Sequence, residues 1–255
     1  MANSGNPFTR GTGSDSSVSL SERIRRMKRR WQYDWRNDGP VVTSSLIAVN
    51  IVVFIVQMVA RFIPQFDSAL SAYGALSAGL SFIHPWTLLT NAFMHVGFIH
   101  ILLNMLALYA VGRELERLLG HWPFLGLYMV SALGSSVTYV LWYGSAVNPI
   151  AMGASGAIYG LFGALFVAYN SIQSQSRTQI ILFFLLMFVP SFFGNVAWQA
   201  HIGGFIFGCI LASLMTHGVV ALRSKNIGVR MWIYGSGMSV VLILLWIARW
   251  VSIIK

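Results

Sequence analysis

The sequence predicts an all-α protein, a polytopic bundle of membrane-spanning helices. Three observations lead to this fold class: 56% of the 255 residues are hydrophobic, only 9% are charged, and the apolar residues gather in long segments. About a quarter of the residues of a soluble domain are charged, so lipid must cover most of the surface of this protein. Since a spanning helix takes about 20 apolar residues, the chain has room for about seven crossings.

Residues 1–38 precede the first apolar segment, and we expect them to form a basic, disordered cytoplasmic tail. Residues 1–15 are polar and lack the apolar core of a cleavable signal peptide. The basic cluster that follows is typical either of nucleic-acid binding or of cytoplasmic retention beside a span. We favour retention and expect no nucleic-acid partner, because no nucleic-acid-binding module accompanies the cluster. Attraction to anionic lipid headgroups is a third interpretation. The cluster comprises Arg23, Arg25, Arg26, Lys28, Arg29, Arg30 and Arg36.

Residues 40–218 are predicted to form a core of six spans, and residues 219–255 a cytoplasmic loop followed by a seventh span. Between the first two spans, the segment at about 64–93 is too broken to cross the bilayer and too apolar to be freely solvated. This pattern predicts a loop that lies in the outer headgroup region. The seven apolar segments fall at about 42–63, 94–112, 123–143, 153–170, 178–194, 199–217 and 231–252.

The distribution of Lys and Arg predicts the orientation, because cytoplasmic loops carry an excess of both. If the N-terminus is cytoplasmic, 14 of the 17 basic residues fall on the cytoplasmic side, and only Arg61, Arg249 and Lys255 fall outside. We therefore expect a multi-pass protein of the plasma or inner membrane with its N-terminus inside. The sequence does not indicate an oligomeric state.

Several polar side chains stand in the predicted spans, where they are costly and usually functional. His100 and Asn104 lie in the second span, Ser155 begins the fourth, and His201 begins the sixth. These three spans all run from the outer to the inner face. The hydroxyl, the amide and the imidazoles should therefore lie at a common depth, within roughly 10 Å of the outer face.

Glycine spacing predicts which helix faces meet. Gly156 and Gly160 form a small-xxx-small pair in the fourth span, and Gly204 and Gly208 form another in the sixth, on the face that carries His201. If these faces pack together, the Ser155 hydroxyl and the His201 imidazole come close. A serine hydroxyl becomes a good nucleophile when a positioned base takes its proton, and an imidazole suits that task.

An oxyanion formed on an attacked carbonyl needs hydrogen-bond donors. Backbone N–H groups at the start of the Ser155 helix lack intrahelical partners, and the side chains of Asn104 and His100 could add others. Tyr159, one turn after Ser155, is a candidate to stack on the imidazole. His95 and His100 would point about 140° apart around a helix, so we expect no shared metal site and interpret His95 as a brace for the outer loop.

None of the seven acidic residues lies in the middle of a predicted span. A catalytic carboxylate is therefore not expected, and the site would be a Ser–His dyad. The same observation argues against an aspartyl intramembrane protease, and the lack of a His-Glu pair argues against a zinc enzyme with an HExxH motif. We expect no metal and no cofactor. Glu116 is interpreted as structural, paired with an arginine or capping a helix end, and the single cysteine, Cys209, as a core residue.

Three motifs together resemble the rhomboid family of intramembrane serine proteases, over about residues 86–208. They are Gly-Ala-Ser-Gly-Ala at 153–157, Ala-His-Ile-Gly-Gly at 200–204 with a further glycine at 208, and His95 with His100 and Asn104. One position departs from the family, since its Trp-Arg pair in the outer loop is Trp86-Thr87 here, which removes the usual loop anchor.

The resemblance implies a six-helix core with an extra C-terminal span, and transmembrane proteins as substrates. It implies a Ser155 nucleophile, a His201 general base, and an oxyanion site from His100, Asn104 and the Ser155 backbone. It further implies a helix-ending pattern after the second span, made by Gly112, Glu116 and Gly120. Supporting roles fall on Tyr159, Gly153, Gly156, His95, Gly204 and Gly208.

The leading hypothesis is an intramembrane endopeptidase that acts through an acyl-enzyme on Ser155, in a hydrated cavity open to the outer side. The alternative is a non-catalytic adaptor or chaperone that binds unstable transmembrane helices through the same fold. A third hypothesis is a transporter in which Ser155, His201 and Asn104 line a polar path. Taken singly, Ser155 could be a packing residue and Asn104 a contact between helices.

Overall fold

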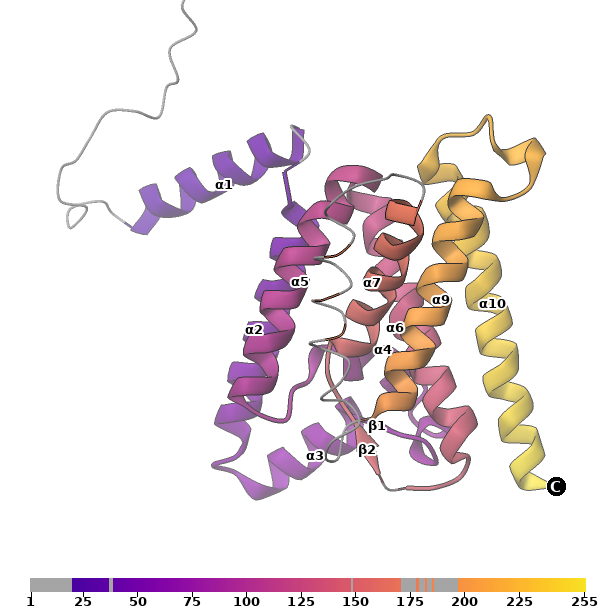
Figure 1. Cartoon of the computed structure of the whole chain (residues 1–255). Helices are drawn as coiled ribbons and strands as arrows, with labels where there is room; N and C mark the ends of the chain where they lie inside the picture. The colour runs from indigo at the N-terminus through magenta and orange to yellow at the C-terminus, as the bar shows by residue number, and fades with distance from the viewer. Residues whose placement is uncertain are drawn as a thin grey trace, which may run out of the picture.

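The computed structural model describes residues 20–36, 39–147, 149–170 and 197–255, together with the isolated positions 178, 182 and 185. Helices dominate these ranges, and six of them form an upright bundle (Figure 1). The all-α fold class is confirmed. The six helices are α2 (Val41–Ala60), α5 (Phe98–Leu119), α6 (His121–Tyr143), α7 (Ser155–Asn170), α9 (Trp198–His217) and α10 (Ile227–Ile254).

Five helices in the described ranges are long and apolar enough to cross a membrane: α2, α5, α6, α9 and α10. They correspond to the predicted first, second, third, sixth and seventh spans. The fourth corresponds to α7, a shorter apolar helix, and the predicted span at 178–194 lies outside the described residues apart from positions 178, 182 and 185. The chain is therefore an integral membrane protein with a helical bundle.

Helix α7 is central, and its contact with α9 is the most extensive between any two described helices. The contact is close because the predicted glycine faces meet there. A Cβ atom added at Gly204 would overlap the carbonyl oxygen of Gly156, and one at Gly208 would overlap that of Gly160. The backbones of the two helices thus touch directly, as small-xxx-small pairs allow.

The N-terminal ends of α5, α7 and α9 lie at one end of the bundle, which we call the strand end (Figure 1). A two-stranded antiparallel sheet is found there, with Leu76 opposite Ala151 and Ser77 opposite Ile150. Between α2 and α5 the chain forms only short elements, none long enough to span. They are α3 (Pro64–Gly74), β1 (Leu76–Ser77), η2 (Leu80–Phe82), α4 (Thr87–Thr90) and η3 (Asn91–Phe93), and β2 (Ile150–Ala151) completes the sheet.

Side chains pin these short elements to backbone carbonyls. Trp86 Nε1 donates to the carbonyl of Tyr73 at 2.8 Å, and Thr90 Oγ1 donates to that of Gly74 at 2.9 Å. Thr87, which stands where the family that the sequence resembles has arginine, is buried and donates to the carbonyl of His84 at 2.7 Å. Local hydrogen bonds therefore hold this loop without the arginine.

At the opposite end, helix α1 (Leu20–Arg36) extends away from the bundle (Figure 1). This differs from the disorder expected for residues 1–38. The difference has a physical reason, because Arg, Lys, Met and Glu dominate this segment and all favour helices in isolation. Residues 1–19 lie outside the described ranges.

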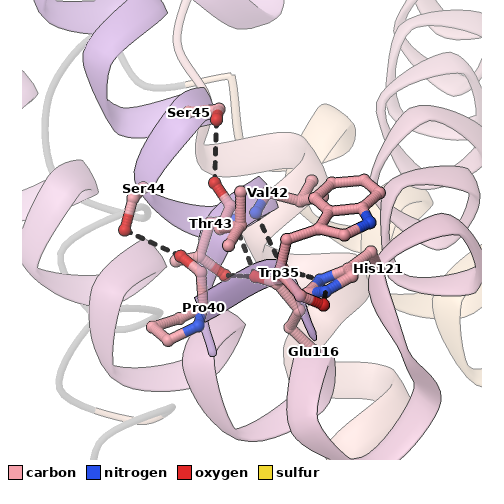
Figure 2. A network of polar contacts seen from close by, with 9 residues as sticks. Trp35, Pro40, Val42, Thr43, Ser44, Ser45, Glu116 and His121 are labelled. Atoms are coloured by element: carbon pink, nitrogen blue, oxygen red, sulfur yellow. Dashed lines mark hydrogen bonds and ion pairs between the residues drawn. The ribbon is translucent and has the colours of Figure 1, made fainter. Parts of the chain in front are cut away.

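Glu116 joins α1, α2, α5 and α6 at this end (Figure 2). Its buried carboxylate accepts hydrogen bonds from Val42 N (2.7 Å), Thr43 N (2.8 Å) and Thr43 Oγ1 (2.7 Å), so it caps the start of α2. His121 Nδ1 lies 2.5 Å from the same carboxylate, and the Trp35 ring stacks on His121 with centroids 4.4 Å apart. Glu116 is thus a cap, one of the two structural roles expected for it.

Candidate active site

Ser155 is the first residue of α7 and His201 lies in the first turn of α9, both at the strand end. His201 Nε2 is 2.8 Å from Ser155 Oγ, within hydrogen-bonding distance. His201 is buried and Ser155 is half-buried. The glycine contact one turn away brings the two backbones close enough for this pair to form.

Tyr159 lies one turn after Ser155 and is itself buried. Its ring stacks on the His201 imidazole, with centroids 4.2 Å apart and an angle of 23° between the planes. A stacked ring restricts rotation of the imidazole about its side-chain bonds. The arrangement therefore keeps Nε2 directed at the Ser155 hydroxyl.

Gly153 gives the turn before Ser155 its shape, since its φ of 141° is disfavoured for residues with a side chain. Its N–H donates to the carbonyl of Asn91 at 2.9 Å, which ties the turn to η3. A Cβ atom added at Gly153 would lie 2.7 Å from His100 Cε1 and 3.4 Å from Ser155 Oγ. The lack of a side chain thus allows the His100 ring to stand beside Ser155.

Asn104 lies one turn after His100 on α5 and is buried. Its Nδ2 has no hydrogen-bond partner among the described residues. A buried, unpaired donor costs about 1–3 kcal/mol, so its presence in a native site calls for an explanation. A ligand oxygen, or a water molecule that a ligand replaces, would satisfy it.

His95 differs from its predicted position. It lies in the loop before α5, which begins at Phe98, and its ring contacts the His100 ring with centroids 5.2 Å apart. The expectation that the two rings point apart was wrong, because it assumed a continuous helix. His95 is fully buried, and its backbone N–H and carbonyl both pair with the Gln57 side chain, at 2.9 Å and 3.2 Å. In the part of the chain that the structure describes, no group of three or more His, Cys, Asp or Glu residues is placed to hold a metal.

A cavity of about 430 Å³ lies against the Ser–His pair. Ser155, His201, His100 and Gly153 all line it, whereas Asn104 is not among the lining residues. A water molecule takes about 30 Å³ of liquid volume, so the space has room for several water molecules. The cavity thus exposes the hydroxyl and the imidazole to one shared volume.

Sequence reasoning missed two supporting groups. Asn91 Nδ2 donates to Ser136 Oγ at 2.9 Å, and this fixes the carbonyl that holds Gly153. On α6, Ser131 and Ser135 face the glycines of α7, since a Cβ atom at Gly160 or Gly156 would overlap their hydroxyls. The four-residue spacing of these serines matches that of the glycines and is the signal that could have identified this contact.

Comparisons of the sequence with known proteins find one family. A family model described as the rhomboid domain matches residues 82–218. The chain is 31% identical over 189 residues to the rhomboid protease GluP of Bacillus subtilis, which covers 71% of this chain and 36% of that protein. It is 30% identical over 181 residues to the putative rhomboid protease YdcA of the same species, covering 69% and 88%. It is 32% identical over 137 residues to the RHOMBOID-like protein 5 of Arabidopsis thaliana, covering 51% and 44%. The matched region thus spans less than half of GluP and of the plant protein.

Proposed function

Because this chain belongs to the rhomboid family, in which intramembrane proteolysis is the common activity, we propose that it is an intramembrane serine endopeptidase with Ser155 as nucleophile. The observation that carries the proposal is the 2.8 Å separation of Ser155 Oγ and His201 Nε2 beside a cavity. A nucleophile and a base within hydrogen-bonding distance, with a third group that orients the base, are what covalent catalysis requires. Here Tyr159 orients the base by stacking.

The reaction begins when His201 Nε2 accepts the hydroxyl proton and Ser155 Oγ attacks the scissile carbonyl. The oxyanion accepts hydrogen bonds from backbone N–H groups at the start of α7 and from the His100 side chain, with Asn104 adding a donor after a small shift. The protonated His201 gives its proton to the leaving amine, which leaves an acyl-enzyme. Water then enters the cavity, His201 takes a proton from it, and the water oxygen attacks the ester carbonyl. The bond from that carbonyl carbon to Ser155 Oγ breaks, Oγ receives the proton from His201, and the carboxylic acid product leaves.

No Asp or Glu lines the cavity within the described ranges, so the proposed site works as a dyad. In a dyad no carboxylate orients the imidazole, so its orientation depends on packing. The Tyr159 stack and the glycine contact between α7 and α9 both serve that task.

The proposed substrates are transmembrane proteins whose helices unwind near small residues. An intact helix keeps its carbonyls in internal hydrogen bonds, so the scissile carbonyl becomes accessible only when the helix opens. We further propose that the N-terminus is cytoplasmic and that the cavity opens toward the outer side. The basic segments in the first 38 residues and around Arg113, Arg117, Arg223 and Lys225 support this orientation.

A fluorophosphonate probe tests the proposal without knowledge of the substrate, since a serine nucleophile displaces its fluoride and keeps the phosphonate. The purified full chain in lipid bilayers should be labelled, and Ser155→Ala should not. Ser44→Ala is the matched control, because Ser44 is an exposed serine bonded to the carbonyl of Pro40 at the other end of the bundle.

The alternatives give different results in the same preparation. An adaptor would show no labelling of the wild type and would retain bound transmembrane proteins after Ser155→Ala. A transporter would show solute flux in liposomes that survives Ser155→Ala. Either result would overturn the protease proposal.

A further inference from the structure

Helix α10 lies at the edge of the bundle, and only 11% of its most apolar window is buried. Even so, its side chains contact η2, the segment that follows β1. Trp246 Nε1 donates a hydrogen bond to Ser81 Oγ at 3.3 Å. The Phe82 ring stacks on Trp246 and on Trp250, with centroids 5.6 Å and 6.2 Å apart and planes within 23°.

These contacts hold η2 through the side chains of Ser81 and Phe82. Ser81 is fully buried, and its hydroxyl donates to the carbonyl of Ala78 at 2.7 Å while it accepts from Trp246. Both functions of the hydroxyl are therefore used. Trp246 and Trp250 are four residues apart, so they lie on one face of α10, where they meet Phe82.

The segment at residues 76–82 is hydrogen-bonded in turn to residues 146–151, which lead to Ser155. Gly79 N–H donates to the carbonyl of Ala146 at 2.8 Å, and Ser77 Oγ donates to that of Val147 at 2.8 Å. Directly beyond, β1 pairs with β2 at Ile150 and Ala151. A chain of contacts thus runs from α10 through η2 and β1 to β2.

The last link reaches the cavity. Residues 150–153 all line it, and only Met152, Gly153 and Ala154 separate β2 from Ser155. Gly153 has little room, because its φ is positive and the His100 ring stands beside it. Movement of β2 must therefore shift the turn that presents the Ser155 N–H and hydroxyl.

A second contact of α10 reinforces this path. A Cβ atom added at Gly144, where α6 ends with a φ of 63°, would overlap the Arg249 guanidinium. The connection from α6 to β2 is thus contacted by α10 at one end and paired with β1 at the other.

We propose that Trp246 is a positioning residue for catalysis: α10 holds η2 and β1 so that β2 and the turn at Gly153 present Ser155 in a productive geometry. This inference rests on the proposed function, and it gives the seventh helix a role in the site although it contributes no group to the cavity lining. Misplacing a reacting group by about 1 Å can cost about 100-fold in rate.

The test compares full-chain variants in lipid bilayers. Trp246→Ala removes the stack and the hydrogen bond to Ser81, whereas Trp246→Phe removes only the hydrogen bond. Ser81→Ala keeps the stack but removes both the hydrogen bond from Trp246 and the one that Ser81 donates to the carbonyl of Ala78. Trp232→Ala is the matched control, because Trp232 is an exposed tryptophan at the other end of α10. Two quantities are measured: the rate constant for fluorophosphonate labelling of Ser155, and hydrogen–deuterium exchange in the peptide covering residues 146–153.

We expect Trp246→Ala to lower the labelling rate constant between about 10- and 100-fold. Exchange at residues 146–153 should rise in parallel. Trp246→Phe should lower the rate about fivefold, the effect of one ordinary hydrogen bond. Ser81→Ala should lower it at least as much, because it removes two hydrogen bonds, and Trp232→Ala should match the wild type. If Trp246→Ala lowers the melting temperature but leaves the exchange and the labelling rate unchanged, α10 is only structural and the proposal is overturned.

Failure of the proposed function would look different. In that case the wild type itself would not react with the probe, while exchange at residues 146–153 would still report whether Trp246 holds this segment. Unchanged exchange in Trp246→Ala would then overturn the positioning role independently of any activity.

Discussion

Gly204→Ala offers a sharp test of how the α7–α9 contact makes the site. An added Cβ atom would overlap the carbonyl oxygen of Gly156. Since non-bonded heavy atoms pack at about 3.5–4.0 Å, α9 must move away from α7 by about 1.5 Å. Ser155 adjoins Gly156 and His201 lies one turn before Gly204, so the 2.8 Å separation of Oγ and Nε2 would grow to about 4 Å, beyond hydrogen-bonding range.

Two magnitudes follow for Gly204→Ala. Overpacking of a close contact costs about 1–3 kcal/mol of unfolding free energy. Loss of the Ser–His hydrogen bond, combined with misplacement of the base, should lower the fluorophosphonate labelling rate about 100-fold. The loss of activity thus exceeds what partial unfolding of a still folded protein would produce.

Gly237→Ala is the matched control, a Gly-to-Ala change in helix α10 where nothing lies within 4 Å of the added Cβ atom. It should raise the unfolding free energy by about 0.5–1 kcal/mol, because alanine favours the helix, and leave labelling unchanged. Both variants are measured by labelling kinetics and by thermal unfolding in the same lipid. Labelling of Gly204→Ala at the wild-type rate would refute the role assigned to this contact.

Three further predictions concern single positions. Glu116→Gln should lower the unfolding free energy by about 2–4 kcal/mol, because an amide cannot accept every hydrogen bond that the buried carboxylate accepts. Glu22→Gln, at an exposed position, is the control and should change it little. Equal melting temperatures for Glu116→Gln and the wild type would contradict the capping role. Gly153→Ala should lower labelling about 100-fold by forcing the turn away from its φ of 141° and displacing His100, with a normal circular dichroism spectrum; a fully active variant would show that the turn tolerates a side chain. Tyr159→Ala should slow labelling about 2- to 10-fold by removal of the stack on His201, whereas Tyr159→Phe should retain it; equal losses in both variants would point to the hydroxyl instead.

The spans and the Ser–His pair could be predicted because both depend on simple regularities. Hydropathy identifies long apolar segments whatever their neighbours are, and the alternation of direction places the starts of α5, α7 and α9 at one end of the bundle. Glycines at four-residue spacing then indicate the contact that brings Ser155 and His201 together. These arguments need no knowledge of loop structure.

The misplacement of His95 has a physical cause. The predicted span begins at the apolar residue Met94, but Met94 is buried within the protein before the spanning helix starts. Gly97 is extended, and α5 begins only after it. Hydropathy cannot distinguish burial in protein from burial in lipid.

The strand pair and the partners of Glu116 could not be predicted for a different reason, although a capping role for Glu116 was among those expected. Strands of two residues carry no alternating pattern, and their pairing joins segments more than 70 residues apart. Glu116 and His121 are close in sequence, but the N–H groups of Val42 and Thr43 and the ring of Trp35 reach them only in the folded bundle. Such contacts depend on tertiary packing, which a single sequence does not display.

The central claim is that His201 activates Ser155, and mapping of the probe adduct by mass spectrometry tests it most directly. In the full chain the phosphonate should be found on the peptide that contains Ser155, and His201→Ala should reduce the rate of its formation by a factor of about 100 to 10,000. An adduct on another residue, or one that forms on Ser155 at the same rate without the imidazole, would contradict the claim.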